Sequence, residues 1–156
     1  MITSKYPSVS VWRKWDLHIH TPVSKHFKGT FKDLLKNINT TECIALGIND
    51  YATLKGYEQI KNDYSKELPV LFPVLEFRMH NIVTNRNSIS SGTKINFHLI
   101  FNNADEIYER VKTFVNSIDC YNENGDSDQL GNITDSSLPK VTIDFEHVTR
   151  KLNELN

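Results

Sequence analysis

Residues 15–22 read Trp15-Asp16-Leu17-His18-Ile19-His20-Thr21-Pro22 and place two histidines two positions apart in a mostly apolar run. In a β-strand, side chains at i and i+2 point to the same face, with Cβ atoms about 6.5–7 Å apart. Two imidazoles at that spacing can bind one metal ion. Pro22 lacks the backbone donor of a sheet, so the strand is expected to end here with the histidines at its carboxyl end.

The histidine pair is weak evidence for a metal site when it stands alone. The chain has six histidines in 156 residues. At that frequency an H-x-H arises by chance in about one sequence in five. Further ligand-type residues at the ends of other strands are needed before the pair indicates a site.

The composition is that of one globular domain. Hydrophobic residues make up 38% and charged residues 24% of the chain, and the formal net charge is −1. This charge gives no indication of a strongly basic nucleic-acid surface or an acidic tail. A nucleic-acid substrate stays open, because a metal site can bind phosphate without a large basic patch. The sequence contains no Walker A lysine motif, G-x-G-x-x-G or G-x-S-x-G.

The cysteines and the N-terminus favour a reducing compartment. The two cysteines, Cys43 and Cys120, form no C-x-x-C, and a disulfide framework is not expected. Residues 1–14 contain no apolar segment typical of a secretory signal, and no window approaches 18 apolar residues. We therefore expect a cytoplasmic protein without a membrane span.

Hydrophobic spacing predicts strands alternating with helices. Strands are expected at residues 11–19, 42–48, 69–77 and 93–101. Helices are expected from about 31 to 39, from 57 to 64, over the apolar positions 107–118, and within 141–155. Thr30 is the expected cap of the first helix, Asn102 or Asn103 of the third, and Thr142 or Asp144 of the last. Pro73, inside the third strand, predicts a bulge or a sheet edge.

Alternating strands and helices predict a parallel α/β architecture. In such a sheet the carboxyl ends of the strands lie on one side. Residues 119–140 are polar and lack periodicity, which predicts a mobile loop.

The strand ends bring together residues that commonly bind metals. The first strand offers His18 and His20, the second Asp50, the third Glu76 and the fourth His98. Three imidazoles and two carboxylates at one rim are typical of a site for one or two divalent ions.

Each of these residues also has a purely structural interpretation. Asp50 could only cap the following segment, and a lone strand histidine such as His98 is often a hydrogen-bonded core residue. Glu76 is harder to explain without a partner, because an unpaired buried carboxylate is costly.

In order along the chain, these motifs resemble the PHP (polymerase and histidinol phosphatase) family of metal-dependent phosphoesterases. Asp16-Leu17-His18-Ile19-His20-Thr21 resembles the first motif of the family and Gly47-Ile48-Asn49-Asp50-Tyr51 the second. Glu76 corresponds to the bridging glutamate and His98 to the histidine of the third motif. His26 falls where many members have another metal-binding histidine. Trp12-Arg13-Lys14-Trp15, Gly56-Tyr57 and Asn96-Phe97-His98 are similar to the PHP segment of TrlF-type AAA-like ATPases.

The resemblance implies a single PHP-like domain over residues 1–156, folded as part of a distorted (β/α)7 TIM-like barrel and incomplete at its C-terminal side. It implies a phosphoesterase that uses Zn, Mn or Fe, with His18, His20, Glu76, His98 and His26 as ligands and Asp50 as a catalytic or ligand-orienting residue. Its substrate would be a phosphoester, and nucleic acid and an ATPase domain or subunit are its candidate partners.

Two departures from the family pattern lead to an alternative. Tyr51 replaces the usual histidine of the second motif, and the final Asp-x-His is absent, the nearest match being Asp144-Phe145-Glu146-His147. The alternative is a catalytically incomplete module with a structural or regulatory role beside an ATPase.

Overall fold

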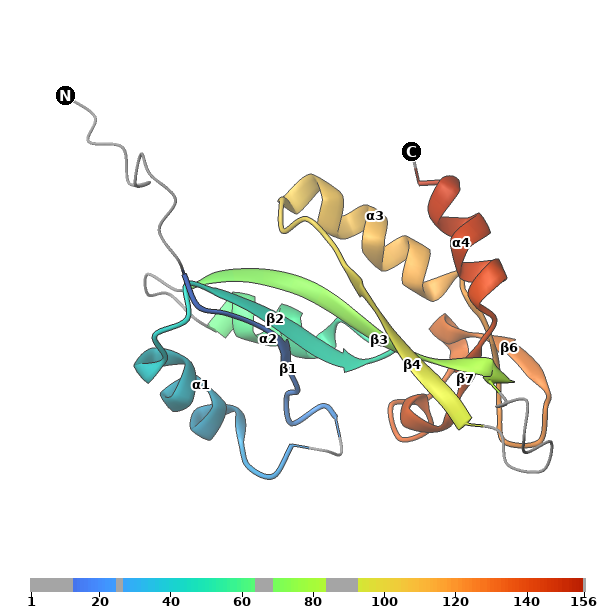
Figure 1. Cartoon of the computed structure of the whole chain (residues 1–156), viewed down its shortest axis with the longest axis horizontal. Coiled ribbons are helices and arrows are strands. Elements are labelled where there is room, and N and C mark those ends of the chain that lie inside the picture. Colours follow the sequence, from blue (N-terminus) through green and yellow to red (C-terminus); the bar gives the residue numbers. More distant parts are fainter. Residues whose placement is uncertain (1–12, 25–26, 64–68, 84–92, 156) are drawn as a thin grey trace.

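The computed structural model describes residues 13–24, 27–63, 69–83 and 93–155. Within these residues the chain forms a mixed α/β fold with one seven-stranded sheet and four α-helices (Figure 1). The strands are β1 Trp15–Ile19, β2 Ala45–Tyr51, β3 Val70–Val83, β4 Thr93–Ile100, β5 Asp119–Tyr121, β6 Ser127–Gln129 and β7 Thr142–Ile143. The helices are α1 Phe31–Thr40, α2 Lys55–Asp63, α3 Asp105–Asn116 and α4 Phe145–Asn153, with two short 3-10 helices at Leu130–Asn132 and Leu138–Lys140.

Local capping explains where the helices begin. Thr30 and Asp33 form a reciprocal capping box at α1, and the Asp144 side chain accepts a hydrogen bond from the backbone of His147 at α4. The predicted Thr30 cap is confirmed, and of the two candidates for the last helix, Thr142 and Asp144, Asp144 is the cap. The predicted asparagine cap of α3 is wrong, because α3 begins after Ala104 without a side-chain cap. Asn102 Oδ1 instead accepts a hydrogen bond from the Ala104 backbone.

The sheet is built around β3, which is 14 residues long. Its first half pairs in parallel with β2, from Val70 to Glu76, and β1 pairs in parallel with the other edge of β2. Beyond the end of β2, Met79 of β3 pairs with β7. Figure 1 shows β3 running through the length of the sheet. The strand order β1-β2-β3-β7-β5-β6 gives an open sheet within the described residues.

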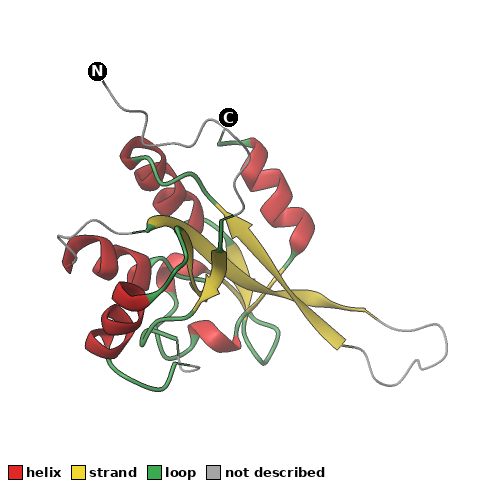
Figure 2. Ribbon diagram, turned by 60° about the vertical axis from the view of Figure 1, so that its left-hand side comes forward, coloured by secondary structure: helices red, strands yellow, loops and turns green. Residues whose placement is uncertain are grey.

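The predicted parallel direction of the fourth strand is wrong. β4 runs antiparallel to β3, with Glu76 opposite His98 and Arg78 opposite Asn96. In Figure 2 the far ends of these two strands extend beyond the helices. Strands β1, β2 and β3 pair in parallel because the crossover helices α1 and α2 lie between them. No helix lies between β3 and β4 among the described residues, and two strands joined in this way can pair antiparallel. His98 therefore lies within an antiparallel strand and not at the carboxyl end of a parallel one.

Pro73 lies where β3 gains its second neighbour. The pairing with β4 runs from Val74 onward, and the last backbone contact of this edge is Phe101 N–H to the Pro73 carbonyl. Before this point, the described pairings of β3 are with β2 alone. The missing donor of Pro73 is therefore tolerated at the place where one side of β3 is a sheet edge, as predicted.

Residues 119–140 are not one loop, which corrects the prediction for this segment. β5 and β6 form a short antiparallel hairpin. Both 3-10 helices follow β6 and lie inside the same segment. Cys120 is buried in β5, where burial raises the pKa of its thiol to about 11. The strands are only three residues long, too short for a periodic pattern to emerge from the sequence. The mobility of the segment stays a prediction.

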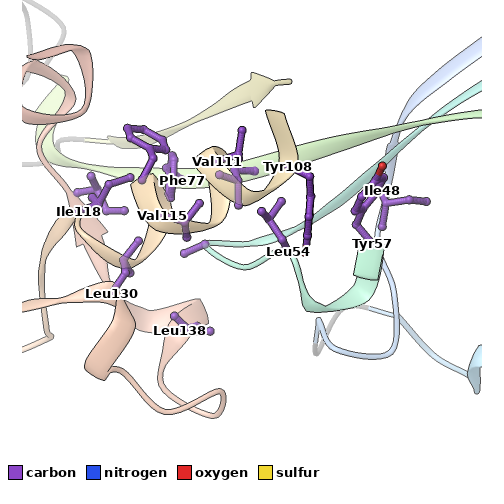
Figure 3. Close-up of a cluster of buried hydrophobic side chains, with 14 of the residues drawn as sticks. Ile48, Leu54, Tyr57, Phe77, Tyr108, Val111, Val115, Ile118, Leu130 and Leu138 are labelled. Atoms are coloured by element: carbon purple, nitrogen blue, oxygen red, sulfur yellow. The ribbon is translucent and has the colours of Figure 1, made fainter. Parts of the chain in front are cut away.

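The apolar face of the sheet carries the core. Leu75 and Phe77 are buried on this face of β3, and α2 and α3 lie side by side over it, joined by the contact between Tyr57 and Tyr108. Figure 3 shows Phe77 and Ile118 gathered with side chains of α3. Because side chains alternate along a strand, Glu76 and Arg78 point to the opposite face. That face presents the candidate site.

No helix among the described residues is long and apolar enough to cross a membrane.

Gly56 allows α2 to approach the end of β2. A Cβ at this position would lie 2.0 Å from Asp50 Oδ2 and 2.3 Å from Thr21 Oγ1, and both residues are buried. A helical glycine replaced by alanine normally gains about 0.5–1 kcal/mol. At Gly56 the steric clash of the added methyl group outweighs this gain in stability.

We expect Gly56→Ala to lower the free energy of unfolding by about 2 kcal/mol, as measured by urea denaturation. Gly131→Ala is the control, because its Cβ would be 3.1 Å from the nearest atom, and it should stay within about 1 kcal/mol of the wild type. A Gly56→Ala protein as stable as the wild type would contradict the close approach.

Candidate metal centre

Four predicted ligands converge on the face of the sheet that carries Glu76. His18 Nε2 lies 3.3 Å from His20 Nε2, and Glu76 Oε2 lies 3.9, 3.4 and 3.6 Å from the Nε2 atoms of His18, His20 and His98. The donor atoms of His18, Glu76 and His98 all lie within 4.8 Å of one another. Three strands thus bring together residues that are far apart in the sequence.

These spacings fit a divalent metal ion. Ligand atoms held 2.0–2.1 Å from a tetrahedral ion are separated by about 3.3 Å. Three imidazole nitrogens and one carboxylate oxygen are the donor set that Zn, Mn and Fe accept. His18, Glu76 and His98 can form one trio and His18, His20 and Glu76 another. Both trios use the single lone pair of His18 Nε2, so they are alternatives, and the four side chains together suffice for one ion.

Glu76 is the buried centre of the cluster. Its side chain is 3% exposed, compared with 53% for His18, 18% for His20 and 34% for His98. The cluster therefore opens to solvent on the histidine side, while its carboxylate is anchored in the sheet.

Two amides from neighbouring strands hold the Glu76 carboxylate. Asn49 Nδ2 of β2 donates to Glu76 Oε2 at 2.9 Å, and Asn96 Nδ2 of β4 donates to Glu76 Oε1. Asn49 Nδ2 also lies 3.4 Å from His18 Nε2, while its Oδ1 is buried without a hydrogen-bond partner among the described residues. A buried polar atom without a partner is unusual, and here it lies beside the cluster.

The amides explain the ionisation of Glu76. Burial raises the pKa of Glu76, but the hydrogen bonds from Asn96 and Asn49 and the nearby imidazoles of His98 and His20 outweigh this effect. The pKa of Glu76 is therefore lower than the ordinary glutamate value. The carboxylate form, which metal binding requires, is the favoured one at neutral pH.

Asp50 is buried beside the cluster and is linked to the ligand His20 through the hydroxyl group of Ser24. It is 1% exposed and accepts hydrogen bonds from Thr21 N–H at 2.9 Å, Thr21 Oγ1 at 2.7 Å and Ser24 Oγ at 2.5 Å. Ser24 Oγ lies 3.3 Å from His20 Nδ1, which turns the Nε2 atom of His20 toward Glu76. These contacts favour an orienting role for Asp50, and its catalytic role stays a prediction.

Two residues of the predicted motif region remain, Asp16 at the start of the first motif and His26. Asp16 Oδ1 accepts a hydrogen bond from the His18 backbone at 3.1 Å, so its described contact is with the main chain. His26 lies outside the described residues.

Tyr51 occupies the place where the family pattern has a histidine. Its ring stacks on the His20 imidazole with centroids 5.4 Å apart. Burial raises the pKa of Tyr51, and the negative charge of Glu76 raises it further. The residue therefore packs as a neutral phenol against a ligand.

The nearest match to the missing Asp-x-His lies in another place. Asp144 caps α4, and His147 Nε2 accepts a hydrogen bond from the Asp119 backbone. Neither residue belongs to the group of possible metal ligands found among the described residues.

Sequence reasoning missed the residues that support the cluster. Asn49, Asn96 and Ser24 were not predicted, although each contacts a ligand directly. The signal that could have found them is position: Asn49 precedes Asp50, and Asn96 lies two residues before His98, on the same face of its strand.

A cavity of about 350 Å³ adjoins the histidine side of the cluster. It lies between β1 and α1 and is lined by His18 and His20 together with apolar residues that include Phe27, Leu34 and Ile38.

Comparison with known proteins gives no further support for a family. No protein-family model matches the chain, and no significant match is found among curated proteins or solved structures.

We expect Asp50→Ala to lower the free energy of unfolding by about 3 kcal/mol, because three buried donors lose their acceptor. Asp50→Asn is the matched control. It keeps an oxygen for Thr21 N–H and Ser24, and should cost about 1 kcal/mol. Urea denaturation measures both. Equal stability of Asp50→Ala and the wild type would show that these hydrogen bonds are not structural.

We expect Asn49→Ala to raise the pKa of Glu76, because the carboxylate loses one of the two amide hydrogen bonds that offset the effect of burial. Carbon-13 NMR titration of the Glu76 carboxyl group in metal-free protein measures this shift. In the wild type, the lowered pKa stabilises the fold above the unfolded-state pKa, and this stabilisation is lost as the pH falls through the folded-state pKa. In Asn49→Ala this stabilisation should be smaller, and its loss should be complete at a higher pH than in the wild type. An unchanged Glu76 titration would contradict the role of the amide.

Proposed function

We propose that this protein is a metal-dependent phosphoesterase of the PHP type. The observation that carries the proposal is the convergence of His18, His20 and His98 on the buried carboxylate of Glu76. The resemblance of the motifs adds the phosphoester substrate, with nucleic acid as one candidate. An ATPase domain or subunit is a candidate partner on the same ground.

The residues of the chain would act by holding and orienting the ligands. Asn49 and Asn96 fix both oxygens of Glu76, and Ser24, held by Asp50, orients His20. A divalent ion held by these residues would supply a water with a pKa of about 7 and positive charge for the phosphate oxygens. Because His18 is half exposed, a substrate can reach the cluster from solvent.

We also propose that the sheet is part of a distorted (β/α)7 barrel. The parallel pairing of β1, β2 and β3, with α1 and α2 between them, supports this architecture. The antiparallel β4 does not belong to a regular barrel of this kind and is the main departure from it.

A second candidate function is a catalytically incomplete module that acts beside an ATPase. It is favoured by the position of Asp144 and His147, which serve α4 and β5 instead of the cluster. In this alternative the protein binds metal without turning over a phosphoester.

Metal content measured on purified protein tests the proposal. We expect the wild type to bind at least one divalent ion, and we expect both Glu76→Gln and the double variant His18→Ala, His20→Ala to weaken binding by about 100-fold or more. Loss of residues that only orient ligands already costs about 10- to 100-fold. His80→Ala is the control, because the described contacts of His80 are with Thr142 and Tyr121.

Unchanged metal content in both cluster variants would overturn the proposal. Hydrolysis of bis(p-nitrophenyl) phosphate with Mn, Zn, Fe or Mg then separates the two candidate functions. Turnover that is lost in Glu76→Gln supports the phosphoesterase, whereas metal binding without turnover supports the incomplete module.

A further inference from the structure

Arg78 lies next to the cluster, and none of its described contacts is with one of the four ligands. It is half-buried, two residues beyond Glu76 on β3, and therefore on the same face of the sheet. Its cross-strand neighbour on β4 is Asn96, just as His98 is the neighbour of Glu76. The cation thus occupies the next position of the sheet beyond the Glu76–His98 pair.

Two residues that contact the cluster also fix the Arg78 guanidinium. Arg78 Nε donates to Asn96 Oδ1 at 3.3 Å, and the other end of the same amide donates to Glu76 Oε1. The Arg78 Cζ atom lies 6.0 Å from the centroid of the Tyr51 ring, which itself stacks on His20. A single amide group therefore separates the guanidinium from the Glu76 carboxylate.

The Asn96 amide keeps two opposite charges apart. Arginine commonly pairs directly with a neighbouring carboxylate. Here, none of the carboxylates in the described part of the chain lies within salt-bridge distance of Arg78, and among those residues Asn96 alone accepts a hydrogen bond from it. Glu76 keeps its oxygens for the cluster, and the terminal nitrogens of Arg78 keep their capacity to bind an anion.

We propose that Arg78 binds the non-bridging oxygens of the phosphoryl group at this cluster. The inference rests on the proposed function and names the residue that recognises the anion. A guanidinium presents its N–H groups in a planar fork that matches two phosphate oxygens. A phosphoryl group beside Glu76 and His98 would meet that fork from the solvent side.

Phosphate binding tests the inference separately from catalysis. Inorganic phosphate is titrated calorimetrically into the full chain, with and without saturating Mn. Arg78→Met should keep the metal affinity of the wild type and lose about 10- to 100-fold in phosphate affinity, because charge-assisted hydrogen bonds are lost. Arg78→Lys, which keeps the charge without the fork, should fall between the two. Arg110→Met removes the same charge from an exposed position on α3 and should bind phosphate like the wild type.

The outcomes separate the inference from the proposed function. Equal phosphate affinity in Arg78→Met and the wild type, with metal bound to both, overturns the inference and leaves the proposed function standing. Phosphate binding that depends on Arg78 in a chain that binds no metal supports the anion site and overturns the proposed function. If the wild type binds no phosphate in either state, the inference is wrong. Circular dichroism checks folding, and if Arg78→Met does not fold, Arg78→Lys decides by a several-fold loss of phosphate affinity.

Discussion

The burial of the Glu76 carboxylate is the constraint that the rest of the site serves. A charged group with only 3% exposure is tolerated when hydrogen-bond donors surround it. Glu76 has amide donors from β2 and β4 and faces imidazoles from β1 and β4. A strand receives side-chain donors from two neighbouring strands only when it has a neighbour on each side. The arrangement around Glu76 therefore requires β3 to lie inside the sheet.

The sequence was most informative where the signal is local. The caps Thr30 and Asp144 follow from side-chain chemistry within one helical turn, and the structure confirms them. It also brings together His18, His20, Glu76 and His98, although the expected reason was only partly right. Their convergence was deduced from parallel strand ends, whereas His98 reaches Glu76 across an antiparallel pair. Strand direction depends on long-range pairing, which a periodic pattern does not encode.

The supporting residues were beyond the reach of motif reasoning for a related reason. Asparagine on a strand has no distinctive spacing, and Asn49 and Asn96 become important only through the cross-strand register that places them beside Glu76. Asp50 was assigned to the chemistry because of its position after an apolar strand. In the structure it is enclosed by Thr21, Ser24 and the helix at Gly56. Asp50 and Glu76 are both buried among hydrogen-bond donors, and the difference is that Glu76 faces the three imidazoles. That arrangement is a property of the fold.

The pairing of Glu76 with His98 across consecutive strands bears on the order of assembly. Contacts between consecutive strands close a shorter loop than contacts that join β1 to β3, and they cost less chain entropy. The folding chain can therefore form a two-ligand half-site from β3 and β4 before the N-terminal strand docks. His18 and His20 would join Glu76 and His98 only when β1 docks, so that the four-residue cluster is completed together with the parallel part of the sheet.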